Sequence, residues 1–178
     1  MDNKNKTIVV NIKKCLACKS CEIACAMVHS HSEALEEAIA KSPKPQRMIT
    51  VETAGEFGLP IQCRHCQDAQ CIEICPTGAI YRDSEQAPVV VDEQLCIGCK
   101  MCMLICPFGI LQIDKKGRAI IKCDMCLERM DKGQEPACVE ACPTGALKLI
   151  SLEEVTKSKR REVSKQLVKE VEKKKSKS

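Results

Sequence analysis

Four cysteine-rich runs constrain the fold of this 178-residue chain more than any other feature. They span residues 15–25 (the first run), 63–75 (the second), 96–106 (the third) and 123–142 (the fourth). The cysteines of the first and third runs are separated by two, two and three residues, and the middle gap widens to four in the second run and to eleven in the fourth. Together the runs use all sixteen cysteines: Cys15, Cys18, Cys21, Cys25, Cys63, Cys66, Cys71, Cys75, Cys96, Cys99, Cys102, Cys106, Cys123, Cys126, Cys138 and Cys142.

The spacing within a run indicates metal ligation. The third run, CIGCKMCMLIC, is followed by Pro107. Its cysteines are too crowded to pair with one another as disulfides, but three of them can surround one metal centre while the fourth points elsewhere. Cys-x2-Cys-x2-Cys-x3-Cys-Pro is the spacing of bacterial ferredoxins, in which the fourth cysteine ligates the other 4Fe-4S cluster of a pair. Four such runs predict four 4Fe-4S clusters.

Three runs end in the same phrase, which indicates internal duplication. The copies are ICPTGAI at 74–80, ICPFGIL at 105–111 and ACPTGAL at 141–147. Small residues near the ligands let backbone N–H groups approach the sulfurs, and the glycines among them also suit turns that need a positive φ. These residues are Gly78, Ala79, Gly98, Gly109, Gly145 and Ala146.

Composition agrees with a core filled by something other than aromatic side chains. The chain has no Trp, one Tyr and two Phe. Its N-terminal apolar run is too short for a signal-peptide core of about 7–15 residues, and no stretch approaches the roughly 20 apolar residues of a membrane span. We therefore expect a cytoplasmic protein without a direct membrane span, in which clustered thiols serve metal or redox chemistry.

Zinc is the alternative metal. Cys123, Cys126, Cys138 and Cys142 could form two zinc knuckles separated by a loop. Three thiols at i, i+3 and i+6 before a Cys-Pro pair are a poor zinc pattern, so the four runs together favour 4Fe-4S clusters. Four clusters, each with a net charge of about −2 including its thiolates, would change the formal charge of +4 to about −4.

The four runs and their widened gaps resemble a known family across residues 7–150. It comprises the four-cluster iron–sulfur electron-transfer subunits that accompany molybdenum or tungsten oxidoreductases, formate dehydrogenases, hydrogenases and nickel carbon monoxide dehydrogenases. It includes small iron–sulfur subunits of complexes of the hydrogen-dependent carbon dioxide reductase and formate hydrogenlyase type. One departure is Cys25, which is followed by Ala26 rather than by proline.

The resemblance implies that the first run pairs with the fourth and the second with the third, and that the chain has no catalytic residue. Carried over residue by residue, it implies four ligand sets, each of three cysteines from one run and one from its partner. The sets are Cys15, Cys18 and Cys21 with Cys142; Cys123, Cys126 and Cys138 with Cys25; Cys63, Cys66 and Cys71 with Cys106; and Cys96, Cys99 and Cys102 with Cys75.

The expected fold class is α+β, with two tandem bacterial-ferredoxin-like lobes related by pseudo-twofold symmetry and a core filled by clusters. Short helices would carry the last cysteine of each run at 21–28, 69–75, 100–106 and 136–142, and three of them end before a proline. Strands are expected at 7–12, 79–82, 88–92, 110–114, 119–122 and 146–150. Residues 1–150 form one domain, because the outer runs pair and the lobes interleave in sequence.

Residues 26–62 are an insertion between the first two runs. We expect a short helix within 31–40 and a strand at 47–52, and a surface position where a partner could bind; a plain covering flap is the alternative. His29 and His31 are expected at the surface or beside a ligand rather than as ligands. His65, inside CRHC, could hydrogen-bond a sulfur or face solvent.

The tail, residues 151–178, is a charged helix that begins with a capping box of Ser151 and Glu154. It carries a charge of +5, whereas residues 1–150 carry −1. A narrow apolar stripe runs along it: Val155, Val163, Leu167 and Val171. The tail is either a solvated terminal helix or an assembly helix that docks on another subunit or on a second copy. It has no aromatics for nucleic-acid binding and no large apolar side chains for membrane attachment.

The sequence contains no nucleotide-binding glycine motif and no phosphate loop. We therefore expect an electron-transfer subunit without a substrate-converting site. It would conduct electrons between redox enzyme subunits of the formate dehydrogenase, hydrogenase or carbon monoxide dehydrogenase type, with a second iron–sulfur subunit as a further partner. The alternative is a structural subunit whose C-terminal helix builds a larger complex or filament around a shared electron wire.

Overall fold

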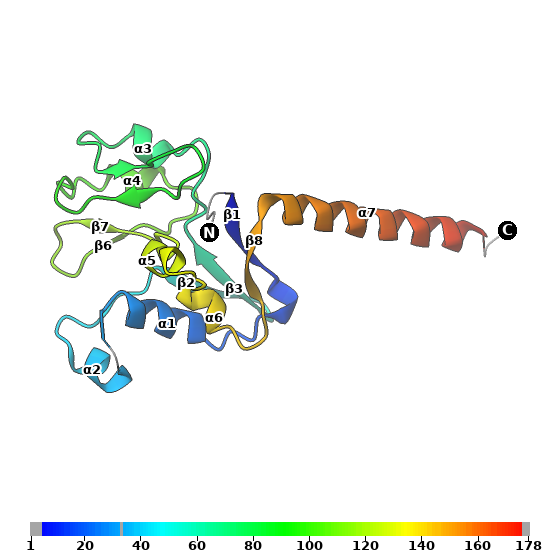
Figure 1. The fold of residues 1–178 in the computed structure, drawn as a ribbon, viewed down its shortest axis with the longest axis horizontal. Coiled ribbons are helices and arrows are strands. Elements are labelled where there is room, and N and C mark those ends of the chain that lie inside the picture. The colour runs from blue at the N-terminus through cyan, green and yellow to red at the C-terminus, as the bar shows by residue number, and fades with distance from the viewer. Residues whose placement is uncertain (1–4, 33, 176–178) are drawn as a thin grey trace.

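The computed structural model describes residues 5–32 and 34–175, an α+β fold of short elements (Figure 1). In the described part, the strands associate as four separate antiparallel pairs rather than as one sheet. The pairs are β1 (Lys6–Val10) with β8 (Leu147–Ser151), β2 (Ile49–Ala54) with β3 (Phe57–Gln62), β4 (Ile80–Tyr81) with β5 (Val90–Val91), and β6 (Gln112–Ile113) with β7 (Ile120–Ile121).

The four predicted helices are present, but only the first contains the last cysteine of its run. The other three end before Cys75, Cys106 and Cys142, so the prediction that helices carry these cysteines is wrong. The four helices are α1 (Ser20–Val28), α3 (Gln70–Glu73), α4 (Met101–Ile105) and α6 (Ala137–Glu140). Two further helical segments were not predicted, the 3-10 turn η1 (Ile12–Lys14) and α5 (Leu127–Asp131). The second of these begins directly after Cys126 and takes up much of the eleven-residue gap of the fourth run.

The first of two clusters of buried residues joins the ends of the chain. The register of β1 and β8 sets Ile8 opposite Leu149, and α1 packs against α6. This cluster contains Ile8, Leu147 and cysteines of the first and fourth runs. The N-terminal and C-terminal parts of residues 1–150 therefore share one core.

The second cluster contains cysteines of the second and third runs. Its fully buried members include Ile80, Val89 and Ile120, each at most 2% exposed. Cys102 is buried with them, and Cys71 and Cys106 are among the partly buried residues that pack against them. Aliphatic side chains and cysteines fill this core, which agrees with the scarcity of aromatic residues.

The insertion is partly buried. The predicted helix is α2 (Leu35–Ala40), which is mostly exposed as expected. The predicted strand is β2, but its Ile49 and Val51 are 2% and 6% exposed and belong to the first cluster. A surface position is therefore wrong for this part, because β2 packs against α1 and the N–H of Val51 donates to Glu22 Oε1 at 2.6 Å.

The partner strand β3 was not predicted, because Gly58 and Pro60 weaken its strand pattern. Gly58 has a packing role: a Cβ built on it would lie 2.8 Å from the Cβ of Ala17 in the first run. The hairpin of β2 and β3 therefore lies directly against the first cysteine loop.

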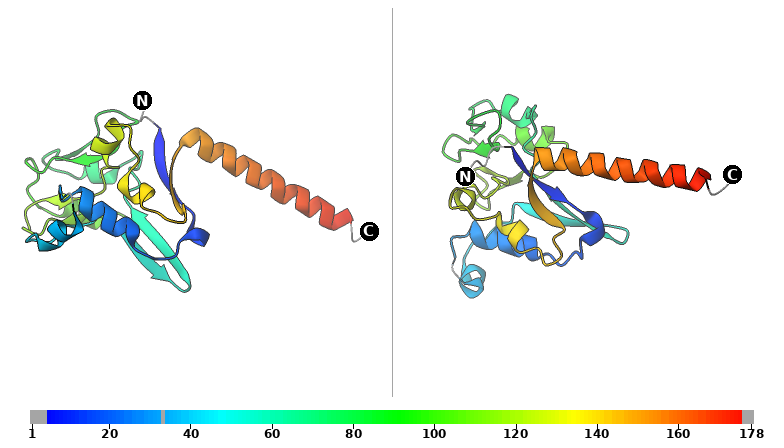
Figure 2. Two further views of the ribbon diagram at one scale, coloured as in Figure 1. Left: turned by 60° about the horizontal axis from the view of Figure 1, so that its bottom comes forward. Right: turned by 45° about the vertical axis from the view of Figure 1, so that its right-hand side comes forward.

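The last helix, α7 (Leu152–Lys175), projects away from the rest of the chain, as the views of Figures 1 and 2 agree. Its capping box is confirmed, since Ser151 and Glu154 exchange hydrogen bonds at 3.1–3.3 Å. Val163 and Leu167 are more than half exposed, whereas Val171 lies outside the described side chains and residues 176–178 outside the described chain. Docking of this helix on a partner stays a prediction. Within residues 5–32 and 34–175, none of the helices is both apolar and long enough to cross a bilayer.

Shortening one buried side chain of β8 should lower the stability of the protein strongly. Leu147 is 1% exposed, so Leu147→Ala should lower the free energy of unfolding by about 2–5 kcal/mol through lost burial and a residual cavity. Leu167→Ala on the exposed face of α7 is the matched control and should change it by less than about 0.5 kcal/mol. Anaerobic urea unfolding followed by circular dichroism measures both, and equal effects would contradict the placement of β8 in the core.

Candidate metal centres

One cavity brings together cysteines of the second and third runs. Cys63, Cys66, Cys71 and Cys106 line a cavity of about 280 Å³ whose remaining walls are largely apolar. The first three come from the loop before α3 and from α3 itself, and the last follows α4. Four cysteines from two distant segments thus line one cavity.

A second, smaller cavity brings together the first and fourth runs. Cys15, Cys18, Cys21 and Cys142 line it. The pairing of β1 with β8 explains this juxtaposition, because Cys15 follows β1 closely and Cys142 precedes β8. The last cysteine of the fourth run therefore lies away from the other three cysteines of that run.

Those other three lie near Cys25. Burial raises the pKa of the thiols of Cys123, Cys126 and Cys138, and the nearby charge of Cys25 raises each of them further. Because Cys142 lies in a different cavity, the four cysteines of the fourth run do not converge on one point. This geometry argues against the single zinc site that their spacing alone would allow.

The third run forms the remaining group. Burial raises the pKa of Cys102 to about 11, and the charges of Cys96 and Cys99 add to that rise. Cys75, the last cysteine of the second run, packs against the same buried cluster as Cys96. All sixteen cysteines are free thiols, and each of the two cavities is lined by cysteines of two runs.

Every run has the same unusual backbone conformation before its second cysteine. Ala17, His65, Gly98 and Met125 have φ of 53°, 48°, 67° and 61°. Residues with a side chain rarely adopt positive φ, and such turns direct successive N–H groups into a concavity that accepts negative charge. The N–H groups of His65 and Met125 donate to the sulfurs of the preceding cysteines at 3.5 and 3.4 Å. The sequence indicated this conformation only at Gly98, because Ala, His and Met give no signal for it.

The repeated closing phrase supplies further donors. Cys75 and Cys142 are each followed by Pro-Thr-Gly-Ala. Although burial acts to raise the pKa of each thiol, hydrogen bonds lower it overall. The donors are equivalent in the two copies: the backbone N–H groups of Thr77, Ala79 and Ile80 at Cys75, and those of Thr144, Ala146 and Leu147 at Cys142. The predicted approach of the N–H groups of Ala79 and Ala146 to sulfur is confirmed.

Cys25 lacks this phrase and uses other donors. The N–H of Met48 donates to Cys25 Sγ at 3.2 Å, and His29 Nδ1 lies 3.7 Å from the same sulfur and 2.8 Å from the carbonyl oxygen of Cys25. His29 Nε2 lies 3.1 Å from Oδ1 of Asp124. Asp124 lies between Cys123 and Cys126 in the sequence. Burial acts to lower the pKa of His29, but these hydrogen bonds raise it to about 11. His29 therefore lies beside a candidate ligand, as expected, and ties the first run to the fourth.

The ligand atoms of His29, Asp124 and Cys126 lie within 4.8 Å of one another and could hold a single metal ion. Their mutual hydrogen bonds give a simpler account, since the N–H of Cys126 donates to Asp124 Oδ1 at 2.8 Å while His29 occupies the same oxygen. His31 is exposed.

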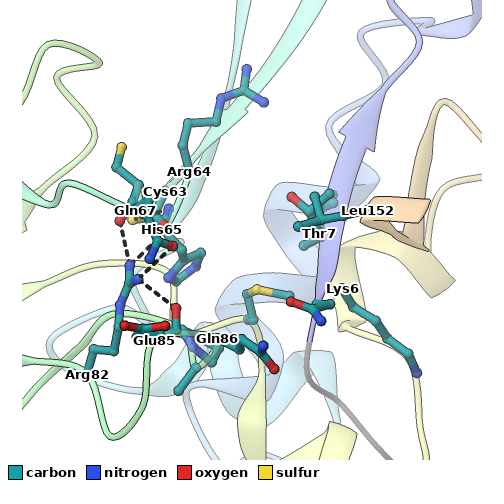
Figure 3. A pocket seen from close by; sticks show the side chains of 16 residues that line it. Lys6, Thr7, Cys63, Arg64, His65, Gln67, Arg82, Glu85, Gln86 and Leu152 are labelled. Atoms are coloured by element: carbon teal, nitrogen blue, oxygen red, sulfur yellow. Dashed lines mark hydrogen bonds between the residues drawn. The ribbon is translucent and has the colours of Figure 1, made fainter. Parts of the chain in front are cut away.

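The loop of the second run is held by an arginine that sequence reasoning missed. Arg82 donates to the carbonyl oxygens of His65, Cys66 and Glu85 and to Gln67 Oε1. Figure 3 shows its guanidinium directed at this loop, at the edge of a cavity of about 460 Å³. The ring of His65 neither faces solvent nor bonds a sulfur: Nδ1 accepts from the N–H of Val89 at 3.0 Å, and Nε2 is buried without a hydrogen-bond partner among the described residues. No sequence motif relates Arg82 to this loop, because His65 and Cys66 lie 17 and 16 residues earlier in the chain.

The donor sets fit iron–sulfur clusters. Three cysteines of one run and one of another line each of the two cavities, and four cysteine thiolates are the ligand set of a 4Fe-4S cluster. The sulfurs also meet inward-turned backbone N–H groups, which stabilise clusters and tune their potentials.

Comparison with known proteins identifies the same elements. Residues 54–152 match the model of the 4Fe-4S dicluster domain, and residues 12–28 match a 4Fe-4S binding domain. An iron-sulfur protein of Rhodospirillum rubrum is 40% identical over 84% of this chain and 84% of its own length. The thiosulfate reductase electron transfer subunit PhsB of Salmonella typhi is 37% identical over 80% of this chain and 73% of its own. The B subunit of the anaerobic dimethyl sulfoxide reductase of Escherichia coli is 33% identical over 83% and 74%.

The tight third-run loop predicts a sharp glycine requirement. Gly98 has a φ of +67°, and a Cβ there would lie 2.7 Å from the carbonyl oxygen of Arg118. Gly98→Ala should therefore destabilise the protein by more than the roughly 1 kcal/mol of a positive-φ alanine, and it should loosen the loop around Cys96 and Cys99.

Gly117→Ala is the matched control, because Gly117 has a φ of +73° and open space around it. Thermal loss of the visible absorbance of anaerobically prepared protein measures both variants. We expect a lower midpoint for Gly98→Ala than for Gly117→Ala, and equal midpoints would show that the contact with Arg118 is unimportant.

Proposed function

The chain belongs to the 4Fe-4S dicluster domain family, and from this premise we propose that it conducts electrons through four 4Fe-4S clusters between the redox subunits of an oxidoreductase complex. The observation that carries the proposal is the convergence of four cysteines from two runs on one cavity, seen for Cys63, Cys66, Cys71 and Cys106. Relatives named as electron-transfer subunits of reductases support the same role.

Four ligand sets follow from the proposal, each named after the run that gives three ligands. The first-run centre is Cys15, Cys18, Cys21 and Cys142; the second-run centre is Cys63, Cys66, Cys71 and Cys106; the third-run centre is Cys96, Cys99, Cys102 and Cys75; and the fourth-run centre is Cys123, Cys126, Cys138 and Cys25. The two lined cavities and the mutual effects of the cysteines on one another's pKa support this partition.

The partition divides the domain into two interleaved lobes with pseudo-twofold symmetry. One lobe holds the first and fourth runs, and the other holds the second and third. The two separate buried clusters and the pairing of β1 with β8 support it. Because one lobe needs both ends of the domain, neither half of the chain can complete it alone.

The protein would hold the clusters in position, bury them and stabilise their negative charge. When bound, 4Fe-4S clusters supply reversible one-electron transfer. The cysteines fix their positions, the aliphatic core excludes water, and the N–H groups directed at Cys75 and Cys142 offset negative charge on sulfur. A substrate-converting site has no place in this role, and an electron carrier needs only entry and exit points for electrons.

The partner enzyme remains the open part of the proposal. Formate dehydrogenase, hydrogenase and carbon monoxide dehydrogenase types are implied by the family resemblance. The relatives' names add thiosulfate and dimethyl sulfoxide reductases. We propose a redox enzyme subunit as the partner, and anaerobic purification of the native complex, with its subunits identified by mass, would assign the enzyme.

Cluster content tests the number of centres. Anaerobically prepared protein should contain about sixteen irons and about sixteen acid-labile sulfides per chain, since each cluster has four of each. On reduction it should give the electron paramagnetic resonance of several interacting 4Fe-4S centres. Zinc in place of iron, or far fewer irons after reconstitution, would overturn the proposal.

Paired substitutions test the partition. Cys18→Ala with Cys142→Ala should remove about four irons, because both residues belong to the first-run centre. Cys126→Ala with Cys142→Ala should remove about eight, because these residues belong to two centres. Iron analysis of the two double variants and of the single variants shows whether Cys142 shares a centre with Cys18 or with Cys126. The reverse order of losses would mean that the fourth run forms a site of its own.

A further inference from the structure

Lys122 is a buried lysine between the second and fourth runs. The residue is 4% exposed, and its Nζ donates to the carbonyl oxygens of Val89 and, at 2.8 Å, of Cys123. Lysines are almost never fully buried unless they are paired. In the described part of the chain, however, no carboxylate lies within ion-pair distance of Lys122. An ammonium held by carbonyl groups alone calls for compensating negative charge from another source.

Hydrogen bonds connect Lys122 to both runs. Val89, whose carbonyl accepts from Lys122, donates its N–H to His65 Nδ1 at 3.0 Å. The N–H of His65 in turn donates to Cys63 Sγ at 3.5 Å. On the other side, Lys122 bonds the carbonyl of Cys123 directly. One continuous series of contacts therefore runs from Cys63 of the second-run centre to Cys123 of the fourth-run centre, with the ammonium between them.

Lys122 lies beside the second-run cavity. Val89, whose carbonyl oxygen accepts from Lys122, lines the second-run cavity together with Cys63 and Cys71. The ammonium therefore contacts a residue in the wall of that cavity. A buried charge is screened much less by salt and water than a lysine at the surface.

We propose that Lys122 is a positioning residue that raises the reduction potentials of the second-run and fourth-run centres together. The inference rests on the proposed function. A cluster with its four thiolates carries about −2 and gains one more negative charge on reduction. A fixed positive charge nearby therefore favours the reduced form, and net charge and burial are among the factors that set such potentials. Lys122 supplies that charge to two centres at the junction of the two cores.

The test compares Lys122→Gln with Lys116→Gln in anaerobically prepared full-length protein. Glutamine can still donate to a carbonyl but carries no charge. Lys116 lies in the exposed turn between β6 and β7, so its substitution makes the same change in net charge without the burial. After iron analysis, redox titration followed by electron paramagnetic resonance gives the midpoint potentials. Wild-type protein with far fewer than about sixteen irons would count against the proposed function and not against this inference.

In Lys122→Gln, two of the four centres should become harder to reduce. At an effective dielectric constant of about 20 and a separation of about 10 Å, the lost attraction changes each reduction equilibrium by about tenfold. The other two centres should shift by a smaller factor, because the attraction falls with distance. In Lys116→Gln all four centres should change by less than about twofold, because water and salt screen a surface charge. Retention of iron with four unchanged potentials would overturn the proposal, as would an equal shift of all four.

If Lys122→Gln loses iron, Lys122→Arg shows whether the centres require the charge of the lysine or its shape, because arginine keeps the charge. Restored iron with two potentials near those of the wild type supports the proposal, because the charge is then what the centres require. Failure of Lys122→Arg to bind iron overturns it, because the shape of the lysine rather than its charge would then be the requirement.

Discussion

The arrangement of the chain depends on thiols that lie beside cysteines of a different run. Cys142 shares a cavity with the cysteines of the first run, and Cys106 shares one with those of the second. For Cys142 to lie there, β8 must return to β1, and this return joins the two ends of the domain in one core. The short strand pairs, each too small to be stable alone, are thereby fixed by packing around sulfur rather than by an extended sheet.

Negative charge at sulfur is the second constraint, and the chain meets it in several ways. Positive-φ turns before the second cysteine of each run direct N–H groups inward. The phrase Pro-Thr-Gly-Ala after Cys75 and Cys142 adds three backbone donors at each. Cys25, which lacks that phrase, receives the N–H of Met48 and lies against His29 instead. The buried Lys122 donates to the carbonyl oxygens of Val89 and Cys123.

The sequence was informative wherever a residue type has a single strong use. The cysteine runs located the candidate ligands, their family resemblance implied which runs approach one another, and the capping box of Ser151 and Glu154 marked the start of α7 correctly. It was uninformative where the cause lies in distant contacts. Tertiary packing determines the burial of β2 and the strand conformation of β3 despite Pro60. It also places Arg82 where it can donate hydrogen bonds to the second-run loop. Likewise, nothing local marks Ala17, His65 or Met125 for positive φ, since the requirement comes from the sulfur-facing loop and not from the residue.

The proposal divides sixteen thiols among four iron–sulfur centres in two lobes. The positions of the iron atoms can be observed directly. Anomalous diffraction at the iron absorption edge from anaerobically grown crystals would locate the metal. We expect four compact iron peaks, with Cys142 beside the peak of the first run and Cys25 beside the peak of the fourth. A single metal atom enclosed by Cys123, Cys126, Cys138 and Cys142, or any group of four cysteines without iron, would contradict this division.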